Sequence, residues 1–175
     1  TVFLGKGESD VKRKILSSIM ALVMIVSMLP FSVFAEEGDT WAESASTEWY
    51  TGDGDEYTIS SAADLAGLAQ LVNGGTSFQK KTIKLGENID LEGKEWTPIG
   101  RNGKPFQGTF DGQGNTISNL KITGNSSDAG LFGFTTGGEI KDFTLNNAQV
   151  EGYLDVGAVA GTPHTSKYTN INVTG

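Results

Sequence analysis

TISNLKITG (116–124), EIKDFTLNN (139–147) and KYTNINVTG (167–175) can be written beneath one another so that their apolar residues share positions. The strings start at Thr116, Glu139 and Lys167, so they recur at intervals in the twenties. The shared apolar positions are Ile117/Ile140/Tyr168, Leu120/Phe143/Ile171 and Ile122/Leu145/Val173. Self-similarity at intervals of this size indicates a protein built from stacked repeats.

A second short element repeats in step with these strings. AGLFG (129–133) matches GAVAG (157–161), and QGTFD (107–111) is a weaker earlier copy. The segments between the repeats are rich in Gly, Ser and Asn, which favour turns over helices. Short strands joined by such corners predict an all-β fold, a right-handed parallel β-helix in which each coil stacks on the one before it.

Six segments have the composition of short strands: 82–85, 88–91, 106–110, 116–122, 139–145 and 168–173. One helix is predicted before them. Ser61 and Asp64 have the spacing of a capping box, apolar residues follow at helical intervals, and Asn73-Gly74-Gly75 supplies a stop. We expect this helix, from Ala62 to Asn73, to plug the N-terminal opening of the β-helix.

Residues 11–35 have the layout of a secretory signal peptide. A cationic start is followed by an apolar run, by Pro30 and by modest side chains that end at Ala35, where we expect cleavage. The alternative is an uncleaved anchor, which needs about 20 uninterrupted apolar residues. Residues 1–10 match no part of a signal peptide and are interpreted as a mis-annotated, untranslated leader. We therefore expect a secreted or cell-surface protein.

The chain has 175 residues, a formal net charge of −8, one His and no Cys. Without Cys there is no disulfide framework, thiolate metal site or cysteine nucleophile. Acidic composition disfavours binding to nucleic acid and, after signal cleavage, to anionic membranes. An exported protein of this size without disulfides fits a bacterial envelope.

Residues 36–56 are acidic and rich in Ser, Thr and Gly, so we interpret them as a linker or loosely docked arm. Trp41, Trp49 and Tyr50 are unusual in such a segment. They are expected either to stack on sugar rings or to pack on the domain that follows. That domain, residues 57–175, is predicted to be the N-terminal part of a β-helix that continues beyond residue 175.

Asn119, Asp142 and Asn170 share a position in the three aligned strings. Stacked amides can hydrogen-bond from coil to coil, with a carboxylate accepting from both neighbours. We interpret this polar column as structural, and a metal or substrate site is the alternative.

Other polar residues are candidates for sites. Asp53, Asp55 and Glu56 are weak calcium candidates, because the segment lacks the full ligand array of a calcium loop and is typical of a solvated turn. The residues available for sugar-cleaving chemistry are Asp90, Glu92, Glu95, Asp111 and Arg101. No spacing forces them together, and His164, the single imidazole, is interpreted as solvated. We predict no catalytic residue, no cofactor and no metal.

Gly130-Leu131-Phe132-Gly133, with WTPIG (96–100) before it and GGEIKDFTLNNAQVEG (137–152) after it, resembles the GLUG-motif proteins of bacterial surfaces. The same stretch is similar to the repeat regions that precede the protease domain in immunoglobulin A metallopeptidases. The resemblance covers about Tyr57 to Gly175 and implies a repeat-built β-helix that serves as a surface or spacer module. One departure is Ala158, which stands where the second copy would have the first Gly of the motif.

The sequence therefore predicts a non-catalytic surface module that acts as an adhesin or scaffold. Its expected partner is an extracellular ligand, a glycan or a host protein, that these residues do not name. The alternative is a non-catalytic N-terminal region of a larger surface peptidase or polysaccharide-active enzyme.

Overall fold

The structure is a computed structural model that describes residues 40–124 and 126–175. The chain divides into two units, Thr1–Ala35 and Glu36–Gly175, and every described residue belongs to the second. The predicted leader and signal peptide lie outside the described residues and stay predictions.

Strands dominate the described residues, and α2 (Ala62–Gly74) is the one helix among them. The strands are β1 (Glu56–Ile59), β2 (Thr82–Leu85), β3 (Ile89–Asp90), β4 (Thr109–Asp111), β5 (Thr116–Ser118), β6 (Lys121–Ile122), β7 (Ser127–Ala129), β8 (Phe132–Thr136), β9 (Glu139–Asn146), β10 (Gln149–Val150), β11 (Leu154–Val156), β12 (Ala160–His164) and β13 (Lys167–Thr174). The predicted all-β class with one helix is confirmed.

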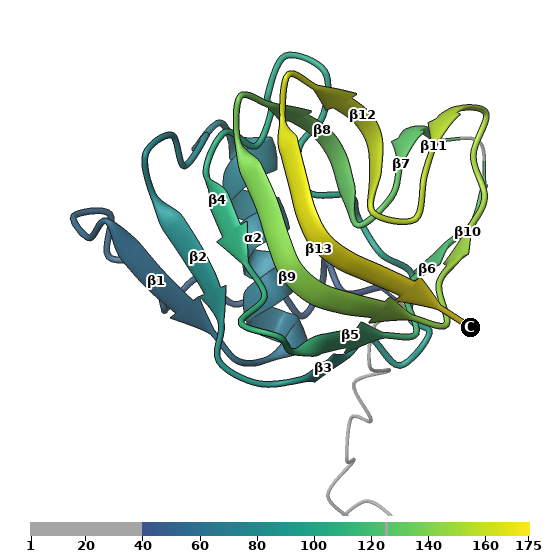
Figure 1. The fold of residues 1–175 in the computed structure, drawn as a ribbon, viewed down its shortest axis with the longest axis horizontal. Coiled ribbons are helices and arrows are strands. Elements are labelled where there is room, and N and C mark those ends of the chain that lie inside the picture. Colours follow the sequence, from purple (N-terminus) through teal and green to yellow (C-terminus); the bar gives the residue numbers. More distant parts are fainter. Residues whose placement is uncertain (1–39, 125) are drawn as a thin grey trace, which may run out of the picture. The chain divides into compact units, whose positions relative to one another are not determined.

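Every pairing between these named strands is parallel, and each strand lies beside its counterpart from the next stretch of chain. We call the length of chain between one strand and its counterpart a pass. The first pass holds β1 and α2, the second β2 and β3, the third β4 to β8, the fourth β9 to β12, and the last β13. Figure 1 shows β1, β2, β4, β9 and β13 side by side in that order.

The two longest strands bend in the middle. The first half of β9 pairs with β4, its second half pairs with β5, and β13 follows both halves. Asp142 in β9 and Asn170 in β13 sit at the bend with φ values of +58° and +51°. Asp and Asn tolerate this left-handed conformation better than most residues, so the two strands turn at the same height.

The interior is one apolar cluster that runs through the passes. Leu131, Phe132 and Leu145 are fully buried in it. Ring contacts join neighbouring passes, since the Phe132 ring centroid lies 5.4 Å from that of Phe106 and 5.2 Å from that of Phe110. Parallel stacking places equivalent side chains above one another, which is why apolar columns form here.

The helix begins and ends where its residues predict. Ser61 caps its start by accepting a hydrogen bond from the Asp64 amide, and Gly75 ends it with a φ of +122°. Leu65, Leu68 and Val72 are fully buried and join the same core as the strands. The predicted helix is confirmed, one residue longer than expected.

The linker interpretation is wrong for residues 40–55. Trp41 is only 8% exposed, and its indole N–H donates to the Leu91 carbonyl over 2.8 Å. The segment passes so close to α2 that a Cβ on Gly67 would collide with the Ser46 carbonyl oxygen. We call residues 40–55 the arm, because it packs against the helix and the core.

The register inferred from the first string is wrong. Residues 116–118 pair with 144–146, and 121–122 pair with 149–150, so Thr116 lies beside Thr144 and not beside Glu139. Leu120 therefore does not share a column with Phe143 and Ile171, although Phe143 and Ile171 do pair. Likewise Ile117 stacks on Leu145, and Ile122 stacks on Val150.

The physical reason for this error lies in one corner. Between β4 and β5 the chain needs Gly112 to Asn115, whereas β9 crosses the same place with a bend at Asp142. Thr109 pairs with Glu139 but Thr116 pairs with Thr144, so the third pass uses two more residues than the fourth between these points. The comparison of strings therefore matches residues that lie on different faces.

The assignment of QGTFD as the earlier copy of AGLFG is also wrong. Thr109 of QGTFD pairs with Glu139, whereas Phe132 is bridged to Ile99 and paired with Ala160. WTPIG is thus the second-pass counterpart of AGLFG, and GAVAG is its fourth-pass counterpart as predicted. The predicted strand 116–122 is divided in two at Asn119, whose φ is +57°.

Candidate functional site

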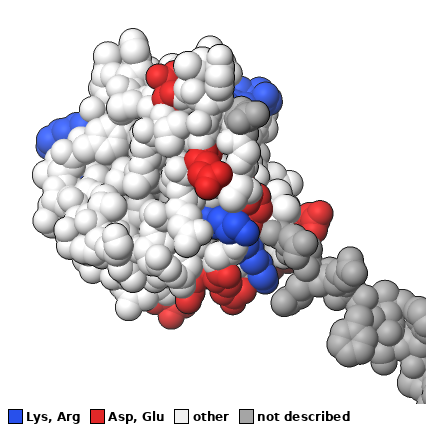
Figure 2. All heavy atoms as spheres, turned by 90° about the vertical axis from the view of Figure 1, so that its right-hand side faces the viewer, with Lys and Arg blue, Asp and Glu red and all other residues white. Residues whose placement is uncertain are grey.

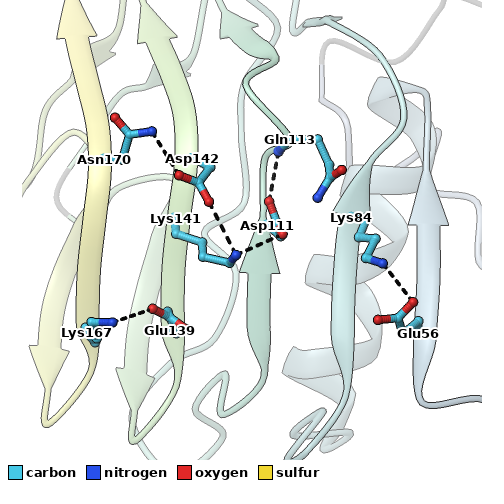
Figure 3. A network of polar contacts seen from close by, with 9 residues as sticks. All are labelled: Glu56, Lys84, Asp111, Gln113, Glu139, Lys141, Asp142, Lys167 and Asn170. Atoms are coloured by element: carbon cyan, nitrogen blue, oxygen red, sulfur yellow. Dashed lines mark hydrogen bonds and ion pairs between the residues drawn. The ribbon is translucent and has the colours of Figure 1, made fainter.

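The outer face of the large sheet carries a row of charged side chains from successive strands (Figure 3). Lys84 contacts Glu56 at 2.7 Å, and Lys167 contacts Glu139 at 2.8 Å. Lys141 lies between two carboxylates, 3.0 Å from Asp111 and 3.3 Å from Asp142. Opposite charges on adjacent strands tie each pass to the next.

The Asp111–Lys141 pair is the most shielded of these contacts. Burial by itself raises the pKa of Asp111, but the Gln113 amide and the Lys141 ammonium group outweigh it, and the pKa lies below its ordinary value. The hydrogen bonds to Asp111 and then to Asp142 raise the pKa of Lys141. Both groups are therefore charged at neutral pH and act as a structural tie.

The predicted polar column is correct for two of its three members. Asn170 donates to Asp142 across 2.9 Å, from β13 to β9. Asn119 belongs to a different ladder, in which it donates to Asp90 and accepts from Asn147, both at 2.7 Å. The hydrogen bond from Asn119, with one from the Glu92 amide, lowers the pKa of Asp90. Both ladders have the coil-to-coil bonding expected of a structural column.

The predicted motif Gly130-Leu131-Phe132-Gly133 forms a tight corner in the core. A Cβ on Gly130 would collide with the Gly157 carbonyl oxygen, and one on Gly133 would collide with that of Gly100. Leu131 and Phe132 between them are fully buried. The motif therefore has a packing role, because only Gly lets the neighbouring passes approach so closely.

The weak calcium candidates do not converge. Among the described residues, no group of three or more acidic or His side chains is placed to hold a metal ion. Glu56 pairs with Lys84, and the hydrogen bond from Thr51 lowers the pKa of Asp53. Asp55 directly precedes β1, where its backbone carbonyl accepts from the Thr82 amide at 2.8 Å.

The acidic residues considered for sugar-cleaving chemistry are engaged in the scaffold. Asp90 and Asp111 belong to the contacts above. Glu95 accepts from both the amide and the hydroxyl of Thr123, at 2.6 and 2.9 Å. Glu92 contacts Lys94 at 3.1 Å.

The two remaining candidates are also held by neighbouring groups. The Arg101 guanidinium donates to the Asn73 carbonyl at 3.4 Å. His164 lies at the end of β12 with its ring stacked on Phe134, and their centroids are 6.5 Å apart. Neither residue is brought beside the carboxylates named above by a contact of its side chain.

A pocket of about 390 Å³ opens between α2 and the loops that carry Trp41 and Trp96. It is lined by Trp41, Ala42, Ala66, Ala69, Gln70, Asn73, Gly74, Trp96 and Thr97. The Trp96 indole N–H is turned away to the Leu131 carbonyl at 3.1 Å, as that of Trp41 is to Leu91. The two rings therefore offer the pocket their carbon surface. We call this the tryptophan pocket.

Sequence reasoning finds only part of this pocket. It identifies Trp41 as a candidate stacking residue, but Trp49 and Tyr50, named with it, pack against Tyr57 and Phe78. It does not identify Trp96. The available signal is the helical spacing of Ala66, Ala69, Gln70 and Asn73, which places small and amide side chains on one side of α2.

The last pass is open to solvent. Tyr153 is 73% exposed and Val173 52% exposed, and Leu154 and Val156 are exposed as well. Figure 2 shows the side of the molecule where β10, β11 and β12 lie, and charged residues are sparse over most of it. β13 pairs with β9 on one side and with no other described strand.

Within residues 40–124 and 126–175, no helix has both the length and the apolar character needed to cross a bilayer.

One known protein with significant similarity is Halomucin from the haloarchaeon Haloquadratum walsbyi, at 36% identity over 149 aligned residues. The alignment covers 75% of this chain but only 2% of Halomucin, so the chain corresponds to a small part of that protein. No protein-family model and no solved structure matches the chain. The resemblance to GLUG-motif proteins therefore stays a prediction.

Proposed function

We propose that residues 40–175 form a right-handed parallel β-helix that serves as a non-catalytic module at the cell surface, where it acts as a scaffold or adhesin. The observation that carries the proposal is the parallel pairing of each strand with its counterpart one pass away. A chain that stacks in this way makes a stiff body whose length grows with each pass, which suits a spacer or a display surface.

The roles of the acidic residues support a non-catalytic module. Asp90, Glu95 and Asp111 each hold a neighbouring pass through hydrogen bonds or an ion pair. A general acid or base has to exchange protons with a substrate near neutral pH, whereas Asp90 and Asp111 have a lowered pKa.

The similarity to Halomucin supports a location outside the cell. It agrees with the signal peptide predicted for residues 11–35. The GLUG-like corner at Gly130–Gly133 and the surface role that it implies belong to this proposal.

Surface display can be tested by labelling, because the chain has no Cys of its own. In the full chain produced by its source cells, Tyr153→Cys introduces a thiol at a 73% exposed position, and Ala129→Cys introduces one at a fully buried position as a matched control. We expect a membrane-impermeant maleimide to label the first variant on intact cells and the second only after denaturation. Labelling of Tyr153→Cys only after cell lysis would contradict the proposal.

A further inference from the structure

The lining of the tryptophan pocket selects an uncharged ligand. Its nine residues are Trp, Ala, Gln, Asn, Gly and Thr, and none of them carries a titratable side chain. A ligand with a phosphate or carboxylate would lose hydration there without gaining a counter-charge from the lining. The chemistry of the pocket therefore favours a neutral molecule.

The two indole rings add a flat carbon surface. Trp41 and Trp96 are 8% and 3% exposed, and both are held in place by the hydrogen bonds of their N–H groups to backbone carbonyls. Rings fixed in this way lose little freedom when a ligand packs on them. Their carbon surface suits the C–H face of a sugar ring, which is apolar on that side and polar around its edge.

Asn73 supplies an acceptor without a partner. Its Nδ2 donates to the Pro98 carbonyl at 3.0 Å, which fixes the amide, while its Oδ1 is buried and has no hydrogen-bond partner. A buried acceptor is stabilised by a ligand that brings a hydroxyl donor, and a purely apolar ligand would leave it unpaired. Gln70 and Thr97 are exposed and offer further polar groups to the same ligand.

The volume limits the size of the ligand. About 390 Å³ lies near the lower end of the range for small-molecule sites, roughly 300 to 1,000 Å³. A single sugar ring suits this space better than a long stretch of polysaccharide.

We propose that the tryptophan pocket binds one neutral pyranose residue, either free or at the end of a glycan. This goes beyond the surface role proposed above, because a scaffold needs no ligand. Trp41 and Trp96 form the apolar walls, and Asn73, with Gln70 and Thr97, bonds the hydroxyl groups.

The test uses the purified full chain and four probes, the methyl pyranosides of glucose, galactose, mannose and N-acetylglucosamine. Saturation-transfer NMR and indole fluorescence report binding at concentrations up to about 10 mM, a range suited to weak single-site affinity. We expect at least one pyranoside to bind, with glucuronic acid and cyclohexanol at least about tenfold weaker because one is charged and the other lacks the hydroxyl array.

Three variants place the binding in the pocket. Ala42→Trp should abolish it, since Ala42 is exposed at the pocket and the larger side chain fills the space. Gln70→Ala should weaken it about three- to tenfold through one lost hydrogen bond. Gln79→Ala is the matched control, because Gln79 is an exposed glutamine outside the pocket. Thermal unfolding checks that each variant is folded.

The proposal is overturned if no pyranoside binds, if the charged or apolar probe binds as well as the pyranosides, or if Ala42→Trp and Gln70→Ala behave as Gln79→Ala does. Such a result would leave the labelling of Tyr153→Cys on intact cells unaffected, so the two proposals fail separately.

Discussion

Leu145 and Val173 occupy the same column of side chains, yet Leu145 is fully buried and Val173 is 52% exposed. Leu145 has Ile117 on one side and Val173 on the other, whereas Val173 has a described neighbour on one side only. The two residues have similar chemistry and the same register. What differs is the presence of a pass on both sides, so burial in this fold depends on stacking as well as on residue type.

The opposite end of the stack is covered. The buried residues Tyr57 and Ile59 of β1 belong to one apolar cluster with α2 and with Trp41 of the arm. An open strand edge with apolar side chains is a site for further pairing, and natural proteins often cover it. The module therefore has one closed end and one end that is free to pair among the described residues.

The largest expected difference between inner and last passes lies in the shared column. Leu145→Ala should lower the free energy of unfolding by about 2 to 5 kcal/mol, because it leaves a cavity in the core. Val173→Ala should lower it by less than about 1 kcal/mol, because half of the side chain is already in water. Urea unfolding followed by circular dichroism measures both, and equal losses would show that the last pass is as well packed as the inner ones.

The covered end can be weakened through the arm. Gly67→Ala should lower the free energy of unfolding by about 1 to 3 kcal/mol, since its Cβ would meet the Ser46 carbonyl and push the arm away. Gly74→Ala is the control in the same helix, because nothing lies within 4 Å of the added Cβ. We expect no loss there, and a rise in Trp exposure by fluorescence quenching only in Gly67→Ala. An unchanged arm in Gly67→Ala would mean that the close contact is not required.

The asparagine ladders compare the two regions at smaller scale. Asn119 bonds to a pass on each side, while Asn170 bonds to Asp142 alone among the described side chains. Both have a positive φ, so the backbone penalty of an Ala substitution is common to the pair. Asn119→Ala should therefore be more destabilising than Asn170→Ala by about 1 kcal/mol, the value of one hydrogen bond. Chemical unfolding of both variants, with Asn119→Gly to remove the backbone effect, measures this difference.

The smallest effect is expected in acid. Because the folded-state pKa of Asp111 is lowered, its contribution to stability is present above the unfolded value of about 3.9 and is lost as the pH falls through the lower folded value. Asp111→Asn should flatten the acid limb of stability against pH. Glu139→Gln breaks the more exposed pair with Lys167, and we expect a change below about 1 kcal/mol at neutral pH. An acid limb unchanged in Asp111→Asn would contradict the role of its ion pair.

Several features follow from the sequence alone, for local reasons. The helix is predictable almost to the residue, since Ser61, Asp64 and Gly75 signal its ends through bonds within a few residues. The pairing of 167–174 with 139–146, and of GAVAG with AGLFG, is also predictable, because both pairs of strings are separated by the same spacing. The all-β class comes from the same strings.

Only the tertiary structure decides which strings stack on one another in the third pass. The two extra residues at Gly112–Asn115 shift the register, and a shift of this kind cannot be seen in the pattern of apolar residues because Ile117 and Ile140 both point into the core. The tryptophan pocket depends on the same level of structure. Trp41, Asn73 and Trp96 meet there because the arm, the helix and a second-pass loop converge, and no local spacing predicts contacts between segments so far apart in the chain.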